Sequence, residues 1–114
     1  GLNCPVKSVF GNCDGEREGL VFALEGFGVV RIEPFSFEEK GIRFIVKHLE
    51  RGITEICRRE EPDVLVFGHT HKPEVDRQGQ TLIINPGETG GWINGRPTVA
   101  LLDTDSLAAK IIPI

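Results

Sequence analysis

The sequence of 114 residues contains no methionine and no tyrosine, one tryptophan and three cysteines. The odd number of cysteines, without a short pairing motif, is typical of reduced thiols, so we expect a cytoplasmic compartment. No apolar run approaches the roughly 18 residues of a membrane span. The first residues also lack the basic and then apolar layout of a signal peptide. The absent methionine indicates that an initiator was removed or that translation began further upstream.

An excess of basic residues is also absent, since 13 Lys and Arg stand against 17 Asp and Glu, for a net charge of -4. This balance argues against nucleic acid or an anionic membrane as a stable partner, because both need a basic face. The 39% hydrophobic and 26% charged fractions exclude a disordered or collagenous chain. A chain of this length supports one domain, which we expect to span residues 1–114.

Hydrophobic patterns predict one helix among about eight short strands. Strands are expected over 5–10, 29–33, 35–37, 42–46, 63–67, 74–76, 81–84, 98–102 and 108–112, with hairpins at 35–46 and 98–112. Residues 17–28 fit either a short helix or a strand. The predicted fold class is therefore a layered α/β or α+β domain, rich in strands.

The helix is predicted from an apolar stripe that begins at Leu49. Leu49, Ile53, Ile56 and Cys57 recur at helical spacing between charged residues, and Pro62 lies just beyond the expected end. The run after Pro62 is almost entirely apolar, which indicates a strand buried on both faces.

All three histidines follow predicted strands. His48, His69 and His71 come just past strand ends, where ligand sites concentrate in layered α/β proteins. On an extended segment His69 and His71 point the same way, whereas a turn would splay them toward two adjacent points. Imidazole is a common ligand of zinc, iron, manganese and nickel. For His48 alone, a hydrogen bond to the backbone is an equally good interpretation.

Two further loops have compositions that ordinary turns share. The amide oxygen of Asn12 is a possible metal ligand, but the loop Gly11–Gly15 is explained as a turn by its composition alone. The same holds for Asn85-Pro86-Gly87. The loop 88–95 carries Trp92, which we expect to pack over that loop.

The charges of these side chains limit what they can bind. Three neutral imidazoles and one amide do not neutralise two divalent cations, which two-metal hydrolytic sites hold about 3.5–4 Å apart around a carboxylate or hydroxide. Near the candidate loops the sequence offers only Asp14 and Glu88 as acids. The visible residues therefore predict a site for one zinc or manganese ion, and a dinuclear centre needs acids from elsewhere.

Three ordered motifs resemble those of the calcineurin-like metallophosphoesterases. Gly11–Asp14 (GNCD), Gly68–His71 (GHTH) and Asn85–Gly87 (NPG) are similar to the family motifs G-N-x-D, G-H-x-H and N-P-G. The resemblance is to the small bacterial and archaeal phosphodiesterase branch, which shares its fold with the retromer sorting subunit of eukaryotes. The run from Gly87 to Trp92 resembles archaeal members. His48 matches the position of a fourth motif, although Leu49 replaces the usual glycine.

The resemblance implies a metallophosphoesterase-type β-sandwich flanked by helices, with a dinuclear site for two divalent ions. Manganese is the usual metal, and zinc, nickel or iron are alternatives. Asn12, His48 and His69 would bind one ion and His71 the other. Asp14 would orient neighbouring groups, so that Asp14 and the three histidines form the implied catalytic set. Cys13 stands where larger relatives have a histidine that acts as an acid for the leaving group.

The family also has two motifs that do not precede Gly11 here. These are D-x-H and G-D, which supply most ligands of one metal and the bridging aspartate. We therefore expect the sequence to be the carboxyl-terminal two-thirds of the family domain, without its first strands and helices. Such a chain would expose apolar surface and strand edges, and would pair with the missing part or with itself.

Three functions follow as hypotheses. The first is a metal-dependent phosphoesterase that hydrolyses a small phosphodiester or phosphomonoester. The second is a binding or scaffold protein of the same fold with a degraded site, which the retention of all four candidate ligands disfavours. The third is a domain with a single structural metal ion.

Overall fold

The computed structural model describes residues 4–12, 14–15 and 17–114, and in these ranges it contains nine strands and two helices. The helices are α1 (Arg17–Leu24) and α2 (Ile53–Glu60). The strands are β1 (Val6–Val9), β2 (Gly28–Arg31), β3 (Phe35–Glu39), β4 (Ile42–Val46), β5 (Val64–Val66), β6 (Glu74–Gln78), β7 (Thr81–Asn85), β8 (Thr98–Asp103) and β9 (Ala108–Pro113). Neither helix has the length and apolar character that a membrane span needs among the residues described.

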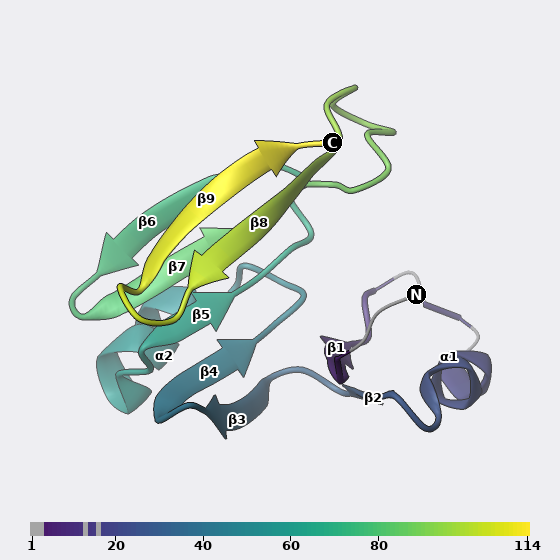
Figure 1. The fold of residues 1–114 in the computed structure, drawn as a ribbon, viewed down its shortest axis with the longest axis horizontal. Coiled ribbons are helices and arrows are strands. Elements are labelled where there is room, and N and C mark those ends of the chain that lie inside the picture. The colour runs from purple at the N-terminus through teal and green to yellow at the C-terminus, as the bar shows by residue number, and fades with distance from the viewer. Residues whose placement is uncertain (1–3, 13, 16) are drawn as a thin grey trace.

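A five-stranded sheet in the order β3-β4-β5-β7-β6 forms the centre of the fold (Figure 1). β4, β5 and β7 run parallel, whereas β3 and β6 pair antiparallel at the two edges. Because the three inner strands share a direction, the loops that follow them leave the sheet at the same edge. Those loops carry His48, the segment 68–71 and the segment 86–97.

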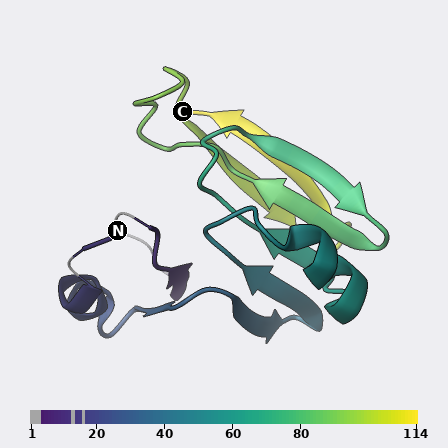
Figure 2. The same ribbon diagram turned by 180° about the vertical axis from the view of Figure 1, so that it is seen from behind.

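The sheet separates two hydrophobic cores. Strand residues alternate between its faces: Leu65 and Ile83 pack with α2, whereas Val64 and Leu82 pack with the opposite cluster. That second cluster lies under the β8–β9 hairpin, which covers the face away from α2 (Figures 1 and 2). Val64 and Leu65 are fully buried, so β5 is the buried strand that its apolar run predicts.

The β1–β2 pair and α1 form a separate part of the fold (Figure 1). β1 and β2 are parallel and have no other strand neighbours in the described chain. Lys7 of β1 links this pair to the central sheet, since its Nζ lies 2.7 Å from Oε1 of Glu39 and 5.0 Å from the centre of the Phe37 ring. α1 has no buried residue, and Val21 and Phe22 are 53% and 76% exposed.

The predicted fold class and both hairpins are confirmed, but the helix predictions need correction. The stripe from Leu49 places the helix start too early, because α2 begins at Ile53. Gly52 is the N-cap residue of α2 and has φ 83°, a left-handed conformation that a helix interior does not contain, so the stripe residue Leu49 lies outside the helix. Of the two structures left open for residues 17–28, the helix is the one that forms, over Arg17–Leu24, so that the described chain has two helices where the hydrophobic patterns predict one. The strand expected over 74–76 continues to Gln78.

Candidate metal centre

Asn12, His48 and His69 bring three donor atoms together although they come from three different loops. Nε2 of His48 lies 2.6 Å from Oδ1 of Asn12 and 3.2 Å from Nδ1 of His69. The two imidazole rings meet edge to face, at an interplanar angle of 79°. The structure thus joins residues that stand 36 and 21 positions apart in the sequence.

These spacings fit the coordination sphere of one divalent ion. Nitrogen and oxygen ligands lie about 2.0–2.2 Å from zinc, so neighbouring ligands lie roughly 3.0–3.5 Å apart. The His48 and His69 nitrogens match that spacing, and Asn12 is slightly closer. No cluster of three or more His, Cys, Asp or Glu side chains occurs in the ranges that the structure describes. The third donor is instead an amide, so the set is neutral.

The Gly11–Asp14 loop positions Asn12 beside His48. The backbone N–H of Gly11 donates to Oδ2 of Asp14 at 2.5 Å, which closes the loop. A Cβ at Gly11 would lie 3.3 Å from both that oxygen and Cε1 of His48, so a larger residue would crowd the site. Asp14 therefore shapes the loop, and among the described residues it forms no hydrogen bond to Asn12, His48 or His69. Cys13 lies outside the described residues.

Glu33 positions the backbone of His48, a role that the sequence does not reveal. Its Oε2 accepts hydrogen bonds from the backbone N–H groups of His48 and Leu49, the second at 2.9 Å. Glu33 follows β2 and lies 15 residues from His48, and no local motif connects the two.

The two histidines of the GHTH segment lie in a turn and diverge. His69 and His71 have φ angles of 66° and 63°, which residues other than glycine rarely adopt. The backbone N–H of Thr70 donates to Gly68 O at 2.7 Å and tightens the turn. His69 consequently faces His48, whereas His71 faces Glu88. Of the two geometries that the sequence leaves open, the structure has the splayed one.

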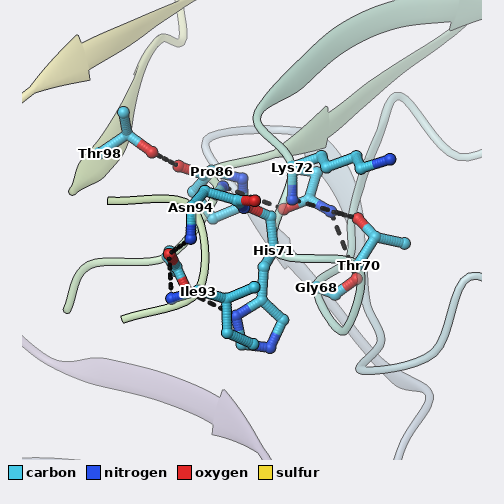
Figure 3. A network of polar contacts seen from close by, with 11 residues as sticks. Gly68, Thr70, His71, Lys72, Pro86, Ile93, Asn94 and Thr98 are labelled. Carbon is cyan, nitrogen blue, oxygen red and sulfur yellow. Dashed lines mark hydrogen bonds and ion pairs between the residues drawn. The ribbon is translucent and has the colours of Figure 1, made fainter. Parts of the chain in front are cut away.

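Glu88 binds His71 and the following loop at the same time, and Figure 3 shows its partners His71, Ile93 and Asn94 close together. Its Oε2 lies 2.7 Å from Nδ1 of His71, and its Oε1 accepts the backbone N–H groups of Ile93 at 2.8 Å and Asn94 at 2.5 Å. Burial raises the pKa of this carboxyl, but the hydrogen bonds from Asn94, His71 and Ile93 outweigh burial and leave the pKa below its usual value. An ionised carboxylate only accepts, so Nδ1 of His71 carries a proton, and Nε2 is the ring nitrogen that could act as a metal ligand.

Asn85 holds the GHTH segment through hydrogen bonds of its side chain, in addition to its place in a turn. Its side chain is fully buried, and Nδ2 donates to Thr70 Oγ1 at 2.9 Å and to Gly68 O at 3.3 Å. Oδ1 accepts the backbone N–H of Gly87 at 3.0 Å. Thr98 continues the network through Pro86 O, as Figure 3 shows. The N-P-G segment therefore holds the GHTH turn in place.

Trp92 does not pack over its loop as expected, because its side chain is 90% exposed. A Cβ at Gly90 would lie 2.7 Å from Cδ1 of Trp92, so the indole edge lies against the glycine backbone. The structure thus gathers Asn12, His48 and His69 in one place, and pairs His71 with Glu88 beside them. The metal-ligand and catalytic roles of these residues stay predictions.

Comparison with known proteins gives consistent matches over nearly the whole chain. Residues 2–107 match the family model described as the calcineurin-like phosphoesterase superfamily domain. A phosphodiesterase of Methanocaldococcus jannaschii is 32% identical over 108 residues, which cover 91% of this chain and 65% of that protein. The phosphodiesterase YfcE of Escherichia coli K12 is 31% identical over 104 residues, which cover 90% of this chain and 55% of YfcE. The chain thus spans about two thirds or less of the length of these relatives.

Two solved structures show the same architecture. One, described as a novel archaeal phosphodiesterase, superposes with a TM-score of 0.88 at 29% identity, over 99% of this chain and 71% of that one. The other is a single mutant of Vps29 from Entamoeba histolytica, with a TM-score of 0.63 at 17% identity, over 98% of this chain and 84% of that one. The second likeness concerns the fold alone.

Proposed function

Because this chain belongs to the calcineurin-like phosphoesterase superfamily, we propose that it is a metal-dependent hydrolase acting on phosphodiesters. Two relatives of more than 30% identity are phosphodiesterases, which supports the reaction class. The observation that carries the proposal is the convergence of Asn12 Oδ1, His48 Nε2 and His69 Nδ1 within hydrogen-bond distances.

The proposed cofactors are divalent ions, with manganese first and zinc, nickel or iron as alternatives. The donor trio of Asn12, His48 and His69 would hold one ion, and Nε2 of His71 would serve a second. Bound metal supplies a polarised phosphoryl oxygen and a water with a lowered pKa. The donor set is neutral, so the carboxylates that a second ion needs would come from the D-x-H and G-D motifs of a further segment of the family domain.

Three acidic residues position the proposed metal ligands. Glu88 keeps the proton on Nδ1 of His71 and so leaves Nε2 available. Glu33 fixes the backbone at His48, and Asp14 closes the loop that presents Asn12. Each of the proposed ligands is therefore held by a neighbouring side chain or loop contact, as ligand residues of metal sites usually are.

The test is hydrolysis of bis-p-nitrophenyl phosphate with added Mn²⁺, by this chain and by a form extended with the D-x-H and G-D motifs. We expect turnover in the extended form, and its loss in His69→Ala and in His71→Ala. Arg58→Gln, on the exposed side of α2, is the control and should leave turnover unchanged. Absence of metal binding and of turnover in both forms would refute the enzyme proposal.

A catalytically incomplete scaffold protein is the alternative, and a single structural ion is another. Metal content separates them from the enzyme. One tight ion per chain without turnover in either form would favour the structural site, and no metal at all would favour the scaffold.

We also propose that the face formed by α1 and β2 pairs with the further segment of the family domain. Phe22 of α1 and Ile32, just after β2, are 76% and 70% exposed, and among the described strands β1 and β2 pair only with each other. The archaeal structure extends beyond the matched region, since this chain covers 71% of it. Gel filtration should show this chain associating and the extended form monomeric. A monomeric chain at all concentrations would contradict the proposal, and association that persists in the extended form would point to self-pairing instead.

A reducing, cytoplasmic compartment likewise stays a proposal.

A further inference from the structure

A cavity of about 110 Å³ opens beside the donor trio. Asn12 and His48 line one side of it, and Phe10, Arg17, Glu33 and Leu49 contribute to the rest. The volume is several times the roughly 10–15 Å³ of probe-occupied volume that one water needs, which leaves room for a tetrahedral anion. The cavity therefore adjoins two of the proposed metal ligands without being formed by them alone.

Arg17 is the one cationic side chain lining this cavity in the described chain. Its Cζ lies 4.7 Å from the centre of the Phe10 ring, a cation–π contact that limits where the guanidinium can lie. Phe10 is itself fixed, because its backbone N–H donates to Arg31 O at 3.0 Å and prolongs the β1–β2 pairing. Arg17 is thus positioned by the same strand that leads into Asn12.

No carboxylate within the described ranges forms an ion pair with Arg17. Two acids of the neighbouring loops bind other groups: Asp14 accepts the N–H of Gly11, and Glu33 accepts the N–H groups of His48 and Leu49. Neither of these carboxylates forms an ion pair with the guanidinium of Arg17. A phosphate oxygen pair matches the planar fork of guanidinium better than it matches an ammonium.

We propose that Arg17 binds the non-bridging oxygens of the substrate phosphate in this cavity. Without metal the donor trio is neutral, so Arg17 then provides the positive charge that attracts a phosphate to His48 and Asn12, and with metal bound it would add to the charge of the ion. This inference rests on the proposed function for the identity of the substrate, and it assigns the charge recognition to this chain's own first helix.

Binding of inorganic phosphate tests the inference without relying on hydrolysis. Phosphate is titrated into the metal-free chain and followed through the NMR signals of the His48 ring and the Arg17 Nε–H. We expect saturable binding that weakens about tenfold or more in Arg17→Gln, because charge-assisted hydrogen bonds are lost. Arg17→Lys should fall between the two, since it keeps the charge and loses the fork. In the extended form, Arg17→Gln should raise KM for bis-p-nitrophenyl phosphate by a similar factor.

Arg58→Gln removes the same charge from the exposed side of α2 and serves as the matched control. Equal phosphate affinity in Arg17→Gln and Arg58→Gln would overturn the inference, as would the absence of saturable binding to the wild-type chain. Acetate competing as well as phosphate would also overturn it, since the cavity would then recognise a carboxylate. Phosphate binding that depends on Arg17, in a protein that hydrolyses no diester in any form, would uphold this inference while refuting the proposed function.

Discussion

Nδ1 of His71 lies 2.7 Å from Oε2 of Glu88, a carboxylate whose side chain is 8% exposed. The pair links the GHTH turn to the loop 88–95, because the second carboxylate oxygen accepts the N–H groups of Ile93 and Asn94. A single acidic side chain therefore determines both the proton position on His71 and the shape of the neighbouring loop.

Replacing Glu88 with alanine should weaken Mn²⁺ binding by the extended form about 10–100-fold, the usual effect of removing a group that orients a metal-binding histidine. Glu88→Gln keeps an acceptor oxygen and should lose less. Calorimetric titration measures both affinities, with Glu38→Ala at an exposed position of β3 as the control. Equal affinities for the alanine variant and the wild type would show that Glu88 does not position His71.

The left-handed backbone at His69 should make glycine the better replacement there. An L-residue in this conformation costs roughly 1–2 kcal/mol, a penalty that glycine avoids. We expect His69→Gly to be more stable than His69→Ala by about 1 kcal/mol in denaturant unfolding of the metal-free chain. The same substitution pair at Glu55, inside α2, should show the opposite order, because glycine weakens helices. An alanine variant at position 69 as stable as the glycine variant would argue against the turn.

Loss of the buried Asn85 amide should destabilise the chain strongly. Asn85→Ala removes three hydrogen bonds and leaves a cavity at a fully buried position, for an expected loss of about 3 kcal/mol in the free energy of unfolding. Thr70→Val removes one of those bonds and should lose about 1 kcal/mol. Both are measured by urea unfolding, and similar losses in the two variants would mean that the amide has no special role.

Asp103 should contribute to stability only above the acid range. Hydrogen bonds from the backbone N–H groups of Asp105 and Ser106 lower its pKa from 3.8. A lowered folded-state pKa stabilises the fold fully above 3.8, and this stabilisation is lost as pH falls through the folded-state value. The stability difference between the wild type and Asp103→Ala should therefore shrink on acidification. Urea unfolding of the two proteins across the acid range measures this difference, and a difference that stays constant on acidification would contradict the prediction.

Sequence patterns predict the strands well because successive residues of a strand point to opposite faces of the central sheet. β5 and β7 place successive residues in opposite cores, and continuous apolar runs indicate that arrangement. The predicted start of α2 fails because Gly52 has a left-handed conformation, with φ 83°, and separates Leu49 from the helix. Helical spacing alone does not register a backbone dihedral angle.

For the site, the sequence supplies the identities of the residues but not their connections. The motifs pick out Asn12, His48, His69 and His71, and the structure adds which of them meet. Asn85 is recognisable only as a turn residue, although its fully buried amide holds the GHTH segment. Arg17 belongs to no motif, and its place beside Phe10 depends on how α1 folds back toward β1.

The contact between Asn12 and His48 joins the buried central sheet to the exposed region that contains α1. His48 follows a strand of the central sheet, whereas Asn12 leads into a helix without a single buried residue. An ion bound by both residues would link β1 and α1 to the central sheet. Its binding would slow amide hydrogen exchange across β1 and α1, and would leave the exchange rates of the already protected strands β5 and β7 unchanged.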